Sequence, residues 1–158
     1  MNVYDAEYFI DKLELIPHVE GGYYRELYKN TKQTSDRSLS TTIYYLLKSG
    51  QVSKFHKLTS DEIWFYHYGA PLTIHMITSN GEYCNSILGL DIEKNQQPQI
   101  IVPAGTIFGA EITDNDTFGL VSCMVSPGFD FNDFHMYTSD ELIEEYPMHE
   151  NIIRTLNG

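Results

Sequence analysis

The chain has few basic residues. Ten Lys and Arg stand against 22 Asp and Glu, so the formal net charge at pH 7 is −12 over 158 residues. A surface this acidic repels phosphate backbones and anionic lipid headgroups. We therefore expect neither nucleic acid nor a membrane surface as a partner.

Cysteines are scarce as well, and long apolar runs are absent. Only Cys84 and Cys123 occur, each in a β-prone segment, which is typical of small buried thiols in a reducing compartment. No stretch approaches the roughly 18 apolar residues that cross a bilayer, and the N-terminus MNVYDAEYFIDKL is acidic where a secretory signal is basic. These features predict a cytoplasmic protein with a single domain, residues 1–158.

Short segments rich in branched and aromatic residues recur along most of the chain, separated by turn residues. About eight to ten of them at this spacing predict an all-β barrel or double-sheet sandwich. The segment Lys29–Ser40 is polar and is expected to be a loop. Helical patterns occur only near the ends, at Asp5–Leu15 with Asp5 as N-cap, at Thr138–Tyr146 and at His149–Leu156.

The stretch from Gly50 to Gly69 holds the most informative pattern. Val52–Leu58 and Glu62–His67 read as two strands around a tight turn, which predicts a β-hairpin. Because side chains alternate along a strand, His56 shares a face with Leu58, and Glu62 shares a face with Trp64 and Tyr66. We expect the imidazole and the carboxylate to meet in a pocket that is otherwise apolar.

Four sequence patterns carry a resemblance to a known family. The spacing of Gly50, His56, Glu62 and Gly69 resembles the first motif of the cupin superfamily, and PAGTIF at 103–108 resembles the second. The segment PHVEGGYYRE at 17–26 resembles the opening motif of the small single-domain cupins called cupin-5, and SPGF at 126–129 resembles their closing motif. The resemblance implies a cupin double-stranded β-helix, a jelly-roll barrel, with short flanking helices at the N- and C-termini.

In metal-binding cupins these two motifs supply three His and one Glu. This chain has Leu58 and Phe108 at two of the His positions, and neither side chain offers a lone pair to a metal. We therefore expect no tightly held metal and no cofactor. Without an ion between them, His56 and Glu62 become titratable groups in a semi-apolar cavity, which suits proton transfer.

Cupins that work without metal, notably deoxysugar epimerases, use a His base beside a carboxylate and a Tyr acid. By this resemblance the catalytic candidates are His56 as base, Glu62 as the group that orients or tunes it, and Tyr66, or else Tyr44, as acid. The candidate ligand-binding residues are Tyr44, Trp64, His75, Phe108, Glu20 and Arg25. We expect a small polar organic ligand such as a sugar or sugar nucleotide, and an epimerase-like or isomerase-like reaction.

Several alternatives stay open at this point. The pocket also fits a non-catalytic binding module, or a metal-dependent oxygenase or isomerase whose missing donors are His75 or water. Glu20 and Arg25 either line the pocket mouth or form an ion pair that holds a turn. The 12 Tyr and 8 Phe exceed what one barrel interior can hold, which predicts a homodimer with Thr41–Leu47 or the N-terminal segment at its interface.

Overall fold

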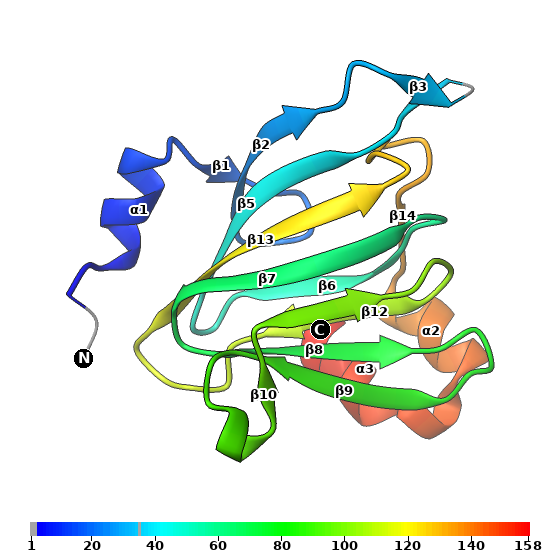
Figure 1. Cartoon of the computed structure of the whole chain (residues 1–158). Helices are drawn as coiled ribbons and strands as arrows, with labels where there is room; N and C mark the ends of the chain where they lie inside the picture. The colour runs from blue at the N-terminus through cyan, green and yellow to red at the C-terminus, as the bar shows by residue number, and fades with distance from the viewer. Residues whose placement is uncertain (1–2, 35) are drawn as a thin grey trace.

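The protein is described by a computed structural model that covers residues 3–34 and 36–158. Two six-stranded sheets pack face to face (Figure 1). The first sheet contains, in spatial order, β1 (Ile16–Pro17), β2 (Tyr23–Lys29), β5 (Thr41–Lys48), β13 (Phe118–Ser126), β7 (Asp61–Gly69) and β11 (Gln99–Val102). The second contains β10 (Gln96–Gln97), β9 (Tyr83–Leu88), β8 (Leu72–Ile77), β12 (Ile107–Glu111), β6 (Val52–Lys57) and β14 (His135–Met136). The prediction of an all-β sandwich is confirmed.

The helices lie near the chain ends, as predicted. They are α1 (Ala6–Lys12), α2 (Ser139–Glu145) and α3 (Glu150–Asn157), with single 3₁₀ turns η1 (Ile92–Lys94) and η2 (Pro147–His149). Asp5 caps α1, because its side chain accepts a hydrogen bond from the Tyr8 amide, and Thr138 with Glu141 forms the expected capping box of α2. None of the helices in residues 3–34 and 36–158 is long and apolar enough to cross a membrane.

The two C-terminal helices cover the outer face of the second sheet (Figure 1). Leu142, Ile153 and Leu156 pack there against Phe55 and Ile77. The predicted polar loop Lys29–Ser40 carries a small hairpin of its own, β3 (Gln33–Thr34) and β4 (Arg37–Ser38).

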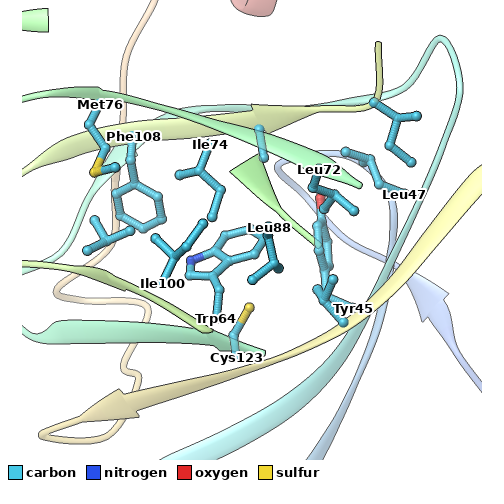
Figure 2. Packing of buried hydrophobic residues seen from close by; sticks show 14 of the residues in the cluster. Tyr45, Leu47, Trp64, Leu72, Ile74, Met76, Leu88, Ile100, Phe108 and Cys123 are labelled. Carbon is cyan, nitrogen blue, oxygen red and sulfur yellow. The ribbon is translucent and has the colours of Figure 1, made fainter. Parts of the chain in front are cut away.

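The space between the sheets is filled at one end and hollow at the other. Along β5, Tyr45 and Leu47 belong to the packed core, whereas Thr41 and Ile43 line a cavity. Figure 2 shows the packed end, where Trp64 lies among aliphatic side chains from both sheets. Burying an apolar side chain of this size contributes roughly 1.5–3 kcal/mol, so the packed end holds the sheets together. The hollow end is then free to carry polar groups.

One predicted local structure is wrong. The stretch Gly50–Gly69 is not a hairpin, because β6 pairs with β12 and β14 while β7 pairs with β11 and β13. The turn at Thr59–Ser60 passes from one sheet to the facing sheet. His56 and Glu62 therefore approach the same interior space from opposite layers.

Candidate functional site

The cavity between the sheets has a volume of about 100 Å³. Four buried ionisable side chains line it: His18, Glu20, His56 and Glu62. Apolar and aromatic side chains form most of the remaining wall. The lining residues are His18, Glu20, Tyr24, Glu26, Thr41, Ile43, His56, Leu58, Glu62, Cys123, Val125, Phe129, Phe131 and Phe134. The structure thus brings His56, Glu62 and Glu20 of the sequence-derived candidates together in one enclosed space.

A β-bulge in β6 orients His56. The register between β6 and β12 shifts so that Phe108 pairs with His56 but Ala110 pairs with Ser53, which leaves one extra residue on β6. The freed backbone of Lys54 is used twice: its N–H donates to the Glu20 carbonyl at 3.0 Å, and its carbonyl lies 2.7 Å from Nδ1 of His56. A carbonyl only accepts, so Nδ1 carries the proton and Nε2 presents a lone pair.

Glu20 reaches this lone pair because the chain before β2 packs directly on β6. A Cβ on Gly21 would lie 1.9 Å from the Val52 carbonyl oxygen, and Gly21 has a φ of +111°, so this close approach needs glycine. The approach places Oε2 of Glu20 at 3.1 Å from Nε2 of His56. Two lone-pair atoms this close share a single proton between them.

The surroundings decide which form the pair takes. Burial raises the pKa of Glu20 to about 7, against the opposing influence of His18 and Ser53. Burial also lowers the pKa of His56 to about 4, although the bond to the Lys54 carbonyl partly opposes the shift. The protonated pair is therefore a neutral imidazole with a carboxylic acid, and it loses its shared proton near neutral pH.

Glu62 supplies a second acid in the same cavity. Burial, reinforced by the nearby Glu20 carboxylate, raises the pKa of Glu62 to about 8 despite a 3.2 Å hydrogen bond donated by Nε1 of Trp64. At neutral pH Glu62 mostly holds its proton. Trp64 and Phe108 do not line the cavity themselves but contact residues that do. Trp64 donates to Glu62, and the centroid of the Phe108 ring lies 4.2 Å from that of the His56 ring.

His18 completes the polar part of the cavity and was not among the residues singled out from the sequence. The Glu20 amide donates to Nδ1 of His18 at 3.0 Å, and burial lowers the pKa of His18 although Glu20 opposes this. The signal for His18 was its place in the segment PHVEGGYYRE. Other lining residues that were not singled out include Tyr24, Glu26, Cys123 and the three phenylalanines at 129–134, a cluster typical of a segment that plugs a barrel or covers a partner.

Two tyrosines expected at the site lie elsewhere. Tyr66 shares the inner face with Glu62 but is four residues further along β7, roughly 14 Å at the usual strand rise, and its hydroxyl donates to the Gly69 carbonyl. Tyr44 alternates with the cavity residue Ile43 and so faces the other side of the sheet, where it packs near α1.

His75 and Arg25 also lie outside the cavity. His75 alternates with the core residues Ile74 and Met76, so it faces away from the space between the sheets. Arg25 is half exposed and contacts Glu14 at 3.0 Å instead of Glu20. The ion pair considered between Glu20 and Arg25 is therefore not formed. Cys84 is exposed, against expectation, and neither cysteine is in a disulfide.

The residues at the family's ligand positions do not fit its metal site. Leu58 lines the cavity and Phe108 packs on His56, and both lack a donor atom. Over the described part of the chain, no group of three or more His, Cys, Asp and Glu is arranged to hold a metal ion. His75 was considered as a replacement for a missing metal ligand. Its Nε2 atom lies 3.4 Å from Oε2 of Glu111, on the outer face of the second sheet.

Comparisons with known proteins find relatives of the same overall fold. The crystal structure of protein SO0799 from Shewanella oneidensis is 44% identical, with a TM-score of 0.95 over 99% of both chains. A hypothetical protein from Leishmania major is 37% identical, with a TM-score of 0.92 over 96% of this chain and 98% of that one. The uncharacterized protein YML079W of Saccharomyces cerevisiae is 30% identical in an alignment that covers 84% of this chain and 74% of that protein.

More distant structures support the fold alone. A mutant of Bacillus subtilis oxalate decarboxylase OxdC is 14% identical, with a TM-score of 0.61 over 90% of this chain and 37% of that one. The expected cupin fold with short flanking helices is confirmed. A family model described as Cupin superfamily (DUF985) matches residues 7–137. The chain therefore belongs to this cupin family.

Proposed function

We propose that the protein binds a small polar organic molecule in the cavity and moves a proton on it, as an isomerase or epimerase does. The observation that carries this proposal is the 3.1 Å contact between Glu20 and His56, with the tautomer of His56 fixed by the Lys54 carbonyl. A base and an acid then line one enclosed space, since Glu62 retains a proton at neutral pH. Paired groups with different proton affinities are the arrangement that general acid–base catalysis uses.

The base in this scheme is the Glu20–His56 pair without its shared proton. A carbon-bound hydrogen next to a substrate carbonyl transfers to the pair as the C–H bond breaks, and Glu62 gives its proton to the carbonyl oxygen, which yields an enol. Return of a proton to either face of the carbon, as the enol oxygen gives its proton back to Glu62, yields the epimer. Where that carbon carries a hydroxyl, protonation of the former carbonyl carbon as the hydroxyl loses its proton to Glu62 yields the isomer. A pKa of Glu20 of about 7 suits a group that gains and loses a proton near neutral pH.

Cavity size narrows the class of ligand. A volume of about 100 Å³ is far below the roughly 300–1,000 Å³ of pockets that enclose drug-sized molecules. No Lys or Arg of the described chain lines the cavity, whereas a diphosphate needs cationic partners. A small sugar or another small polar carbonyl compound is therefore better supported than a sugar nucleotide.

Deuterium exchange tests the proposal without knowledge of the product. The protein is incubated in D₂O with a set of small aldoses, ketoses and amino sugars, and NMR records loss of hydrogens next to the carbonyl. We expect exchange with at least one compound. His56→Gln and Glu20→Gln should slow it by about 10²-fold or more, the usual contribution of a general base. Glu144→Gln, on the exposed side of α2 and remote from the cavity, should keep the wild-type rate.

Each alternative gives a different result. Binding of a compound without exchange at any carbon would favour the non-catalytic module and reject the catalytic part of the proposal. Exchange that stops after treatment with a chelator and returns with one divalent metal would support the metal-dependent alternative and reject the metal-free scheme. Metal analysis of the treated and untreated protein accompanies the assay.

The expected homodimer stays a prediction. The described chain places Thr41–Leu47 in β5, between β2 and β13, where Tyr45, Leu46 and Leu47 are buried by the chain itself. Of the two interface candidates, the N-terminal segment is the one that exposes apolar side chains, at Val3, Tyr4 and Tyr8.

A further inference from the structure

The ionisable side chains of the cavity can supply negative charge but little positive charge. Glu20, Glu26 and Glu62 line it, together with two histidines, while the described residues contribute no Lys or Arg to the lining. Glu20 and Glu62 are more than nine-tenths buried, and Glu26 is exposed near the opening. The whole chain adds a net charge of −12. The cavity therefore attracts positive charge and repels negative charge.

Aromatic rings line the same cavity as these carboxylates. Phe129, Phe131 and Phe134 lie with their ring centroids 4.9 to 6.2 Å apart, and the planes are inclined to one another by 59° to 86°. The Phe134 ring also lies 5.2 Å from the ring of His56, and Tyr24 contributes another ring to the lining. Rings that line one space can offer their negative faces to a ligand, which is how aromatic cages hold cations.

The loop that carries these rings is fixed at both ends. The Phe129 amide donates to Oγ1 of Thr41 at 2.9 Å, and the carboxylate of Asp133 accepts from the amide and the hydroxyl of Thr59. The rings are thus held over the cavity before any ligand arrives. A cage formed in advance loses little conformational freedom on binding.

We propose that the ligand of this cavity carries a positive charge, as a small organic ammonium group held between the phenyl rings and the glutamates. The proposal rests on the proposed function only in taking the cavity as the ligand site. Glu62 offers a specific contact: Trp64 donates to its Oε2 oxygen, and this buried carboxyl lines the cavity.

Proton linkage gives the proposal a second, independent readout. Burial raises the pKa of Glu20 to about 7 and that of Glu62 to about 8, so the empty cavity holds protons that a bound cation would displace. A cation next to a carboxyl favours the ionised form. Binding at pH 7 should therefore release protons to the buffer, whereas a neutral ligand should release none.

A pair of isosteres measures the effect of charge alone. Choline and 3,3-dimethylbutan-1-ol have the same shape and differ by the positive nitrogen; 3,3-dimethylbutanoate is the anionic counterpart. In calorimetric titrations at pH 7 we expect choline to bind about tenfold or more tightly than the alcohol, and the butanoate to bind weakest. The heat of choline binding should depend on the ionisation enthalpy of the buffer, as proton release requires.

Two conservative substitutions test which residues cause the preference for choline over the neutral alcohol. Phe131→Leu keeps an apolar side chain but removes one ring face at an exposed position, and Glu26→Gln removes one charge near the opening. Each should weaken choline binding by roughly 3- to 10-fold and leave binding of the alcohol unchanged. Glu144→Gln makes the same change of charge outside the cavity and should leave both affinities at the wild-type values.

Equal binding of choline and the alcohol, tighter binding of the butanoate, or no binding of any of the three would each overturn the proposal. These results are separate from the exchange assay. Choline binding without any deuterium exchange would keep the ammonium site and reject the proposed catalysis, whereas exchange on a neutral sugar with no preference for choline would do the reverse.

Discussion

Two His–Glu pairs lie on opposite faces of the same sheet. In the cavity, Nε2 of His56 is 3.1 Å from Oε2 of Glu20, and on the outer face Nε2 of His75 is 3.4 Å from Oε2 of Glu111. The residue types match, the distances are similar, and both histidines are more than nine-tenths buried. Neither composition nor distance separates the two pairs.

Their remaining contacts do separate them. Nδ1 of His56, the nitrogen that does not face Glu20, donates to the Lys54 carbonyl. The inner pair lines a cavity together with Glu62. The other nitrogen of His75 lies 2.7 Å from the hydroxyl of Tyr83, and this pair does not line that cavity. Chemistry needs access for a substrate as well as a perturbed group. The inner pair is thus a candidate site, and the outer pair is a structural contact between β8 and β12.

The sharpest way to break the inner pair is to move the segment that carries Glu20. Gly21→Ala would place a Cβ 1.9 Å from the Val52 carbonyl oxygen at a φ of +111°, so the segment must shift away from β6. We expect a loss of about 3 kcal/mol in the free energy of unfolding, measured by urea titration, because overpacking and backbone strain add. Exchange activity should fall with it, since Glu20 leaves His56.

Gly50→Ala is the matched control. Gly50 also has a positive φ, +82°, but a Cβ there would meet nothing within 4 Å. Only the cost of the left-handed conformation remains, about 1 kcal/mol, and the cavity should be unaffected. Equal losses for the two variants would show that the close packing of the Glu20 segment on β6 is not what holds the pair together.

The sequence predicted the sheets, the helix caps and the shared location of His56 and Glu62, because alternation and turn chemistry are local properties. It did not predict that β6 and β7 belong to different sheets. Turn residues at 59–61 fit a hairpin and a sheet-to-sheet connection equally well, and only the pairing of β6 with β12 decides between them.

The role of Glu20 was the larger omission. A glutamate next to Gly21 and Gly22 reads as a solvated turn residue, and its burial depends on a bulge in β6, some 30 residues further along the chain. Bulges and close backbone contacts arise from the packing of distant segments, so a single sequence does not show them. For the same reason the sequence left open whether His75 joins His56 in the interior or faces outward.

The pH dependence of stability should distinguish the buried acids from ordinary ones. The folded-state pKa of Glu62, about 8, lies above the usual 4.5, so the folded protein holds a proton that the unfolded chain has lost. Stability from this proton is present at low pH and is lost as pH rises through 8; Glu20 acts likewise up to about 7. From pH 6.5 to 8 the free energy of unfolding should fall by on the order of 2 kcal/mol.

Histidines with lowered pKa values make stability change with pH in the opposite direction, mostly below pH 6.5. The lowered pKa of His56, about 4, makes stability rise with pH between about 4 and 6.5, and the lowered pKa values of His18, His67 and His75 act in the same direction. This rise fades above pH 6.5, as the unfolded chain loses its remaining imidazole protons. Glu62→Gln should reduce the fall between pH 6.5 and 8 to under about 1 kcal/mol, while Glu144→Gln should keep it. An unchanged slope in Glu62→Gln would mean that this carboxyl is already ionised at neutral pH.

Loss of a contact in the outer pair should have the smallest effect and affect stability alone. Tyr83→Phe removes the hydroxyl that lies 2.7 Å from Nδ1 of His75 and that accepts a 3.1 Å hydrogen bond from Asn85. We expect a loss of about 1 kcal/mol in urea titrations, the usual net contribution of an intramolecular hydrogen bond. Exchange rates and choline affinity should stay at the wild-type values, because the cavity has no contact with Tyr83. A change in either would mean that the outer pair is coupled through β8 and β12 to the cavity, and the two histidines would then belong to one functional unit.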